Sequence, residues 1–505
     1  MKKALIIILT FICAAVAAQP SPRHLYYDKL TDTYLCTIPK DSFRTMKDAL
    51  LPDNTAQIEY TFLPIVQIKG NFGYEYSKGT VTVEMPDDTE SQYELYAKIK
   101  WRGGTTNATN KHKRNYSIKF LNDKDKKQDR KFFGLRNDNH WILDAGQMDR
   151  SRVRNRIANN LWADFARKPY YYDQEPKART ATRGEFVELF LNDEYRGIYC
   201  LMENIDRSQL KLMKYDDDGI HGQLWKGGGT KNANMWNYTE PDNYDEAWGG
   251  LETKYPDIDD VCPTDYSTIY NFVKFVADAT DEDFDAHITE YIDMPAVVDY
   301  FVMVYTLAGI DNYAGKNMFW ACYDKQTDKK LTIVPWDLDC TVGNHFNPDS
   351  LNAWEIQPTT HTDEYWALNL FYRLDSRNVA GFSDQCRARY NELRDTHFST
   401  ESLIKRYTEA MDRLADAGAY RRDSVKWSGD SDLFYRTLSY ETERQDIADW
   451  LTVRLQTIDN YGFPTGIRPV IRTESRGNKL YNLNGQRINA PVKGINIING
   501  KKFIR

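Results

Sequence analysis

Cysteine and histidine are scarce in this sequence, and they do not cluster. Seven cysteines and eight histidines occur in 505 residues. The cysteines form no CxxC pair, and the histidines form no HxxxH or HExxH pattern. A zinc site and a histidine-based metalloprotease site are therefore not supported.

Excess basic charge and long hydrophobic runs are also lacking. The formal net charge is -7, which argues against a dedicated nucleic-acid binder, because such proteins usually carry a basic patch or stripe. After the first eighteen residues no segment has 18 uninterrupted apolar residues. We therefore expect no transmembrane segment in the mature chain. We find no internal repeat and no low-complexity tract.

The first residues, MKKALIIILTFICAAVAA, have the pattern of a secretory signal peptide. Two lysines precede an apolar run from Ala4 to Val16, and small residues follow it. The alternative, a membrane anchor, is disfavoured because the run is short for a bilayer. We predict a signal peptide over residues 1–18, cleavage near Ala18, and an exported protein that is periplasmic, displayed on the cell surface or secreted.

The first half of the mature chain predicts mainly strands. After a mixed lead-in over 19–60, apolar or alternating segments predict strands at 61–70, 79–85, 93–101, 113–120, 140–145, 186–191 and 195–202. In 113–120 the residues Tyr116, Ile118 and Phe120 share one face, and polar residues occupy the other. Apolar residues recur every four positions over 151–165, which predicts a helix.

The second half predicts loops, then mainly helices. Residues 211–262 are rich in Gly, Asp and Asn, and we expect long loops there. From about 264 two apolar-rich helices follow, then strands at 317–323 and 331–339, then helical segments over about 363–460. Short strands and turns are expected over 468–505. The order of elements is that of an α+β protein.

Three groups of residues supply what phosphoryl transfer requires, which is cations for phosphate and carboxylates for metal and nucleophile. A Gly-containing turn over 102–107 begins with Arg102 and lies close to Lys113 and Lys119. Asp337 and Asp339 end an apolar strand, where carboxylates are costly unless they are paired or metal-bound. Asp311 and Asn317 flank a loop that contains glycine.

These pieces resemble the CotH (spore coat protein H) kinase family, an atypical protein-kinase-like group. The matching segments are WRGGTTN at 101–107, KRNYSIKF at 113–120, HWILDAGQMDRSRVRN at 140–155, EFVELFLNDEYRGIYCLMENID at 185–206, IDNYAGKNMFW at 310–320 and PWDLDCTVG at 335–343. The resemblance covers roughly residues 60 to 460. The end of the chain resembles the small β modules that end many exported Bacteroidetes proteins.

The resemblance implies a two-lobed fold and an ATP-dependent activity. We expect a β-rich N-lobe over 61–206, a mostly helical C-lobe over 207–462 and a small C-terminal β segment over 468–505. The implied function is an exported kinase that moves the γ-phosphoryl of ATP to Ser, Thr or Tyr of a protein. ATP and Mg or Mn are the implied cofactors, and the protein acceptor and the choice of metal stay open.

The resemblance also implies roles for single residues. Asp311 corresponds to the catalytic aspartate, Asp337 to the metal-binding aspartate, and Asn317, with Asn312 as an alternative, to a second metal ligand. Asp339 is a further candidate metal ligand. The nucleotide-binding candidates are Arg102, Lys113, Lys119 and Glu203, the last at the hinge where backbone groups would meet the adenine.

The helix at 151–165 would correspond to the kinase αC helix but carries no Glu. The usual Lys–Glu ion pair must therefore differ, with Asp149 or Glu188 as the acid. Arg154 on the same helix either ties it to the Asp337 loop or has a purely structural role.

Each candidate also has a purely structural interpretation. Asp337 and Asp339 can stabilise a strand-end turn, Asp311 can cap a loop, and the lysines can cover a solvated strand face. Two other functions stay open. One is a secreted binding or structural protein whose kinase-like fold is inactive. The other is a glycosidase, which would need two opposed carboxylates roughly 5 to 9 Å apart.

Overall fold

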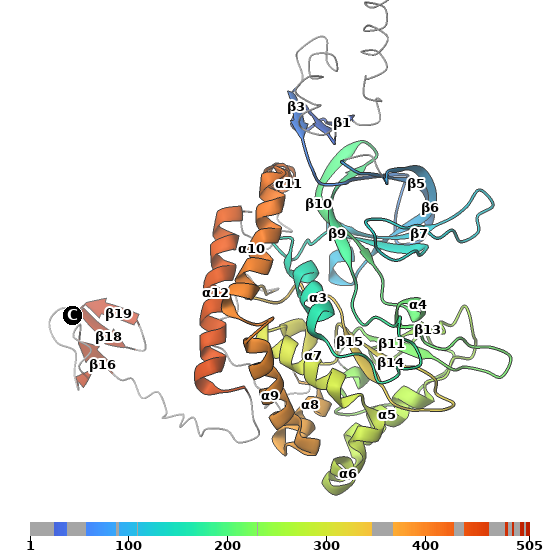
Figure 1. The fold of residues 1–505 in the computed structure, drawn as a ribbon, viewed down its shortest axis with the longest axis vertical. Helices are drawn as coiled ribbons and strands as arrows, with labels where there is room; N and C mark the ends of the chain where they lie inside the picture. Colours follow the sequence, from blue (N-terminus) through green and yellow to red (C-terminus); the bar gives the residue numbers. More distant parts are fainter. Residues whose placement is uncertain are drawn as a thin grey trace, which may run out of the picture.

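The computed structural model describes residues 25–37, 57–86, 90–108, 110–229, 231–345, 367–428 and 439–463, together with strand residues 480–482, 487–488, 495–498 and 501–504. The predicted leader over 1–18 lies outside the described residues, as does much of the lead-in. The described residues form the α+β fold that was predicted, with strands and helices in the expected order (Figure 1).

Seven strands close into a barrel, which the sequence patterns did not predict. The strands are β4 (Ile65–Lys69), β5 (Ser77–Glu84), β6 (Gln92–Arg102), β7 (Asn115–Phe120), β8 (His140–Asp144), β9 (Gly184–Leu191) and β10 (Glu194–Glu203). Their order is β10-β8-β7-β6-β5-β4-β9, and β9 pairs with β10 to close the ring. Tyr116, Ile118 and Phe120 point into the barrel core, as the alternation predicts.

A second sheet has five antiparallel strands in the order β12-β13-β11-β14-β15. They are β11 (Gln223–Gly227), β12 (Ala247–Trp248), β13 (Leu251–Tyr255), β14 (Met318–Cys322) and β15 (Thr332–Pro335). The expectation of long loops over 211–262 was therefore wrong in part, because three of these strands lie there. In Figure 1 this sheet lies below the barrel, with α3 beside it.

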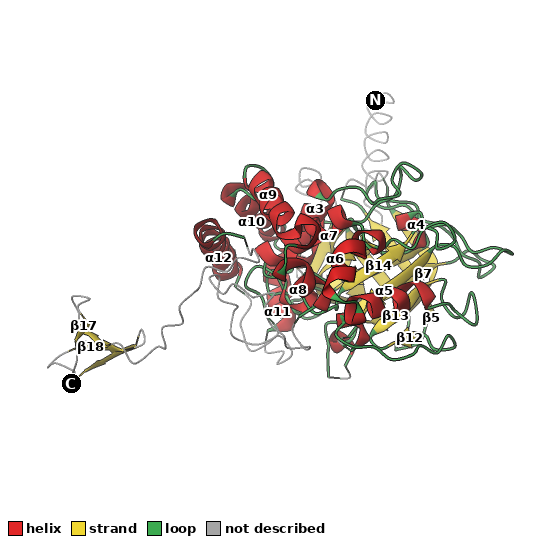
Figure 2. Ribbon diagram, turned by 90° about the horizontal axis from the view of Figure 1, so that it is seen from below, coloured by secondary structure: helices red, strands yellow, loops and turns green. Residues whose placement is uncertain are grey.

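Ten α-helices occur among the described residues: α3 (Arg154–Phe165), α4 (Arg207–Leu210), α5 (Ser267–Asp278), α6 (Asp281–Tyr291), α7 (Met294–Thr306), α8 (Asn369–Ser376), α9 (Phe382–Arg394), α10 (Thr400–Asp416), α11 (Ala419–Trp427) and α12 (Tyr440–Tyr461). Short 3-10 turns are η2 (Thr105–Asn107), η3 (Asn232–Asn234), η4 (Ile310–Asn312) and η5 (Val379–Gly381). Figure 2 shows α9, α10 and α12 gathered on one side and most strands on the other. Helix α7 is buried almost all round and forms the centre of the helical part.

Helix α3 begins three residues later than predicted. Arg152 has a left-handed backbone with φ 62°, which a helix does not accept. Instead Asp149 forms the turn before the helix, because its carboxylate accepts hydrogen bonds from the backbone NH groups of Ser151 at 2.9 Å and Arg154 at 2.7 Å. The acidic residue that precedes α3 thus caps its start.

Two smaller sheets complete the described chain. The first contains β1 (Leu25–Asp28), β2 (Thr33–Cys36) and β3 (Gln57–Tyr60). The second contains the predicted C-terminal strands, in the order β17-β16-β18-β19: β16 (Leu480–Asn482), β17 (Arg487–Ile488), β18 (Ile495–Ile498) and β19 (Lys501–Ile504). Among all these described elements, no helix combines the length and the hydrophobicity needed to cross a membrane.

Candidate active site

The loop after β15 carries two half-buried carboxylates, Asp337 and Asp339. Strand β15 ends at Pro335, four residues before the predicted end, so both acids lie on a loop and not on the strand. Asp337 adopts a left-handed backbone with φ 52°, which ends the extended run. Leu338 between the two acids is fully buried and anchors the loop.

A second loop places Asp311 next to this acid-bearing loop. Asp311 lies in η4, and its carboxylate accepts hydrogen bonds from Asn317 Nδ2 at 2.7 Å and from Lys316 Nζ at 2.8 and 2.9 Å. The carbonyl of Asn317 accepts the Trp336 backbone NH at 3.0 Å. The two loops that carry the predicted acids are therefore joined directly.

Asn312, the alternative to Asn317, has a structural role. Its amide donates to the carbonyls of Asn317 and Trp336, both at 2.9 Å, and its side chain is fully buried. It therefore holds the two loops together from inside. Asn317 is the better candidate ligand, because its side chain already contacts Asp311.

The carboxylates at the site repel one another. Burial, and then the charge of Asp144 at the end of β8, raise the pKa of Asp337, while Lys226 and Arg102 oppose that rise. The pKa of Asp339 lies well above its usual value because of burial and then the charge of Asp337. Such a cluster attracts cations, since added positive charge offsets the repulsion.

Two positive side chains face this acidic cluster, one from each sheet. Arg102 ends β6, stacks over the Trp336 ring with 5.4 Å to the centroid, and interacts with Asp337 and Asp144. Lys226 on β11 interacts with Asp337 from the five-stranded sheet. Arg102 was among the predicted nucleotide-binding residues, and the structure brings it to the acids.

Lys113 does not face this cluster. Its ammonium donates to the carbonyl of Ala145 at 2.9 Å and to that of Ile198, and it pairs with Asp423 at 3.3 Å. The side chain is only 1% exposed. The prediction that Lys113 contacts phosphate conflicts with this placement, because its ammonium is already bound inside the protein.

Lys119 lies at the other end of the same barrel face. Lys119 is paired with Lys98 on β6. Lys98 is four residues before Arg102, which corresponds to a separation of about 13 Å along the strand. The main electrostatic neighbours of Lys119 are Lys127 and the acidic residues Asp257, Asp259 and Asp260. The structure thus separates Lys119 from Asp337.

Glu203 is fully buried, and its carboxylate has structural partners. It pairs with Arg179 at 3.0 Å and accepts the backbone NH of Arg136 at 3.0 Å and of Arg183 at 3.0 Å. Its side chain therefore offers no free acceptor to a nucleotide, although its backbone still ends β10 where the hinge was expected.

Neither proposed substitute for the missing αC glutamate pairs with Lys113. Asp149 pairs with Arg154 at 2.7 Å, and Glu188 pairs with Arg422 at 2.6 Å. The acid that pairs with Lys113 is Asp423 on α11, which also binds Arg152 at 3.0 Å. Both sequence-based alternatives for this ion pair were therefore wrong.

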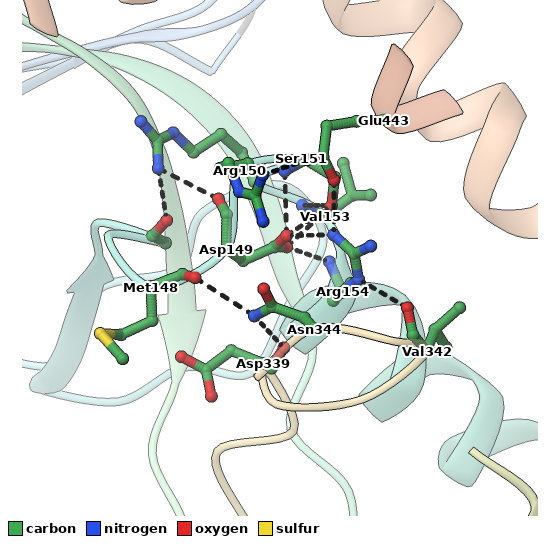
Figure 3. Close-up of polar contacts among 12 residues, drawn as sticks. Met148, Asp149, Arg150, Ser151, Val153, Arg154, Asp339, Val342, Asn344 and Glu443 are labelled. Carbon is green, nitrogen blue, oxygen red and sulfur yellow. Dashed lines mark hydrogen bonds and ion pairs between the residues drawn. The ribbon is translucent and has the colours of Figure 1, made fainter. Parts of the chain in front are cut away.

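Helix α3 is tied to the acid-bearing loop, as one interpretation of Arg154 predicted. Arg154 Nε donates to the Val342 carbonyl at 3.2 Å (Figure 3). The Asn344 amide links the Asp339 carbonyl at 2.9 Å to the Met148 carbonyl at 3.2 Å, and Figure 3 shows these contacts on one side of Asp149. The loop is thus held from the start of the helix.

Asn155, one residue further along α3, makes the closest connection to the acids. Its Oδ1 accepts the Leu338 backbone NH at 3.0 Å, and its Nδ2 donates to Asp144 Oδ2 at 2.7 Å. One side chain therefore orients both Asp144 and the residue between Asp337 and Asp339.

Asp144, Lys226 and Asn155 were not predicted as site residues. Asp144 had a signal, because it ends the apolar segment HWILD just as Asp337 follows the apolar segment LTIVPW. Lys226 had a weaker signal, because it is a lysine within the apolar segment QLWKG. That segment was assigned to the predicted loops over 211–262. The signal for Asn155 was its position beside Arg154 on the helix face, where a structural role was equally favoured because a helical Asn is most often a surface residue.

The donor chemistry at the site suits a hard divalent cation, because carboxylate oxygens are its preferred ligands. Among the residues that the structure describes, however, no group of three or more His, Cys, Asp or Glu side chains is arranged to hold a metal ion. A cation here would therefore take at most two of its ligands from protein carboxylates. Mg²⁺ bound with a nucleotide usually has that coordination, with water and phosphate oxygens as the other ligands.

Comparison with known proteins places the chain in a family. Comparison with curated proteins gave no match. The family model described as CotH kinase protein matches residues 99–458, which include both acidic loops and helices α3 to α11. The chain therefore belongs to the CotH kinase protein family.

Proposed function

We propose that this chain is an exported atypical kinase that transfers the γ-phosphoryl of ATP to Ser, Thr or Tyr of a protein, with Mg or Mn as the required metal. The observation that carries the proposal is the direct connection between the Asp311 loop and the Asp337–Asp339 loop, opposite Arg102. In this proposal the barrel acts as the N-lobe, and the five-stranded sheet with its helices acts as the C-lobe.

Each side chain then has a distinct task. Asp337 and Asp339 would hold the metal together with phosphate oxygens, and Asn317 would be a further ligand. The metal supplies positive charge that offsets the charge developing on the phosphate. Arg102 would bind phosphate oxygens through its planar guanidinium.

Asp311 would act on the acceptor. Its carboxylate would accept the hydroxyl proton as the acceptor oxygen bonds to the γ-phosphorus and the bond to the β-phosphate oxygen breaks, releasing ADP. Lys316 and Asn317 hold this carboxylate in place, so it needs no reorganisation before transfer.

An inactive binding protein is the second candidate. It is favoured by one observation, the placement of Lys113, which is paired with Asp423 inside the protein. Most kinases keep such a lysine at the phosphates. The two candidates differ in whether nucleotide binds and whether phosphate is transferred.

The test uses the mature chain from Gln19 in two assays. Thermal unfolding is measured with ATP plus Mg, ATP plus Mn, and ATP plus EDTA, and radiolabelled ATP is then supplied with and without a generic acidic protein. We expect the melting temperature to rise only when nucleotide and metal are both present, because a ligand that binds the folded state alone stabilises it. No shift at millimolar ATP with either metal would refute the kinase proposal, and a shift without transfer would favour the inactive binding protein.

A further inference from the structure

Lys226 is the one residue of β11 that is not buried. The register places it opposite Glu252 on β13 and Phe319 on β14, so these three side chains share one face of the five-stranded sheet. The neighbouring residues Trp225 and Trp320 occupy the other face, where Trp320 packs on Phe272 of α5 with ring centroids 5.2 Å apart. Lys226 therefore points away from the helices.

Backbone contacts place Lys226 beside the loop that carries Asp311. The carbonyl of Gly227, the next residue, accepts the Asn317 backbone NH at 2.9 Å. A side chain at Gly227 would lie 1.9 Å from the Gly315 carbonyl, so glycine is needed for β11 to approach this loop. The strand that carries Lys226 thus lies against the loop that carries Asp311.

The charges around Lys226 come from its cross-strand neighbour Glu252 and from the candidate site. Burial lowers the pKa of Lys226, whereas Glu252 and Asp337 raise it and Arg102 lowers it further. Glu252 itself pairs with Lys254 at 2.6 Å. Within the described part of the chain no carboxylate forms an ion pair with Lys226, so its ammonium stays available to a ligand.

The other lysines considered for phosphate are engaged or distant. Lys113 is paired inside the protein, and Lys316 is bound to Asp311. Lys119 lies at the far end of the barrel face, among Lys127 and Asp257. Lys226 and Arg102 are the two cations that most oppose the rise in the pKa of Asp337, and Lys316, which also interacts with Asp337, is already bound to Asp311.

We infer that Lys226, from the five-stranded sheet, is the lysine that contacts the nucleotide phosphates, opposite Arg102 from the barrel. This inference rests on the proposed kinase function. It assigns the phosphate-binding lysine to the sheet that also holds Asp311, and not to the barrel. The nucleotide phosphates are then bound between two cations from different sheets, with Asp337 next to both.

The test is covalent labelling with an acyl-phosphate derivative of ATP. A lysine amine close to the phosphates attacks the acyl carbon, the amide bond forms, the bond from the acyl carbon to the bridging oxygen breaks, the nucleotide leaves with that bridging oxygen on its terminal phosphate, and the amine proton passes to water. We expect mass spectrometry of the digested wild-type protein to find the acyl group on Lys226, and excess ATP with metal to suppress it. Labelling of Lys113 or Lys119 instead would overturn the inference.

Two variants give an independent readout. Lys226→Met should raise KM for ATP at least tenfold and weaken the ATP-dependent thermal shift, whereas Lys254→Met, on the next strand, should change KM by less than about twofold. If Lys226→Met does not fold, labelling of the wild-type protein still decides the question. If ATP raises the melting temperature of the wild-type protein, and Lys226→Met keeps the wild-type KM and thermal shift, the Lys226 assignment is refuted but the proposed function is not. If ATP does not raise the melting temperature of the wild-type protein and the acyl-phosphate derivative does not label it, the proposed function and this inference both fail.

Discussion

At the residue scale, Asp337 and Asp339 are held close to other acids although the charged forms repel. Burial and neighbouring carboxylates raise the pKa of both residues. An acid whose pKa is raised by folding destabilises the protein as the pH rises through and above its usual value. The site therefore lowers stability at neutral pH, which is a common property of sites arranged to bind a cation.

Replacing Asp337 tests this directly. Asp337→Asn keeps the size and removes the charge, and Asn tolerates the left-handed backbone that position 337 requires. We expect phosphoryl transfer to fall roughly a hundredfold or more. In EDTA at pH 7 the variant should unfold at higher urea concentration than wild type, with a smaller difference near pH 4. Transfer at the wild-type rate with the same metal dependence would show that the assignment of Asp337 is wrong.

Asp311 should behave differently. Asp311→Asn removes the carboxylate that would orient the acceptor hydroxyl but leaves Asp337 and Asp339 in place. We expect turnover to fall by about a hundredfold or more, since the proton-accepting group is lost, while the metal-dependent thermal shift with ATP is retained. Loss of nucleotide binding in this variant would assign Asp311 to the metal and not to the acceptor.

Lys113 gives a prediction about pH. Burial, only partly offset by Asp423, lowers the pKa of Lys113 to about 7. The unfolded chain, with a pKa near 10.5, then binds more protons than the folded chain between these values, so this residue makes stability rise with pH from about 7 to about 10. In Lys113→Met that part of the rise should vanish, as measured by urea unfolding at pH 6.5 and 9.5. Lys98→Met, on the outside of the barrel, is the control and should keep the wild-type slope.

At the element scale, α3 positions the acid-bearing loop through one amide. Asn155→Asp keeps the acceptor for the Leu338 NH but replaces the donor to Asp144 with a negative charge. We therefore expect Asn155→Asp to slow transfer more than Asn155→Ala does, although Asp resembles Asn more closely in shape. Asn160→Ala, on the same helix, controls for general helix effects. Transfer assays combined with urea unfolding separate mispositioning of the acid-bearing loop from a general loss of helix stability. Equal transfer rates in Asn155→Asp and wild type would exclude a positioning role.

The alternation of apolar and polar residues along single strands made the barrel strands predictable. The closure of these strands into a barrel was not predictable. Tyr116, Ile118 and Phe120 identify β7 because each strand has a periodicity of two. Closure depends on the pairing of β4 with β9, which are far apart in the sequence. The strands β11 to β13 were missed because they are short and lie among Gly and Asp residues, and this error also concealed Lys226.

The partners of buried charges were equally unpredictable. Lys113 and Asp423 are more than 300 positions apart, and only the packing of α11 against β10 brings them together. Gly197 makes this contact possible, because a side chain there would lie 2.1 Å from Asp423 Oδ1. By contrast, Arg102 and Asp337 were predictable because they stand at or just after the end of a strand, and Asp311 because it flanks a loop that contains glycine.

At the scale of the whole molecule, the family match begins inside the barrel. It starts at residue 99, within β6, and so leaves out β4 and β5. The barrel core nevertheless includes Val66 and Ile68 of β4 and Val81 and Val83 of β5. A protein unit defined by the match alone would lack β4, β5 and residues 92–98 of β6.

We therefore expect residues 57–463 to unfold cooperatively and residues 99–463 to fail to do so. Removing β4 and β5 exposes the edges of β6 and β9 and part of the barrel core, which favours aggregation and proteolysis. Thermal unfolding and limited proteolysis of the two fragments test this. A cooperative, protease-resistant fragment 99–463 would show that the barrel tolerates an open edge.

The closed barrel also determines when this protein can fold during its synthesis. Strand β4 pairs in parallel with β9, and Ile65 lies opposite Glu188. Until the chain has been made as far as β10, the first strands have no partner to complete the ring, and loop-closure entropy opposes such distant pairing. The helices that bind its buried charges, such as α11 with Asp423, emerge later still. A nascent chain shorter than about two hundred residues therefore remains open at two strand edges, a state that a transport machinery or a chaperone can keep unfolded more easily than a finished domain.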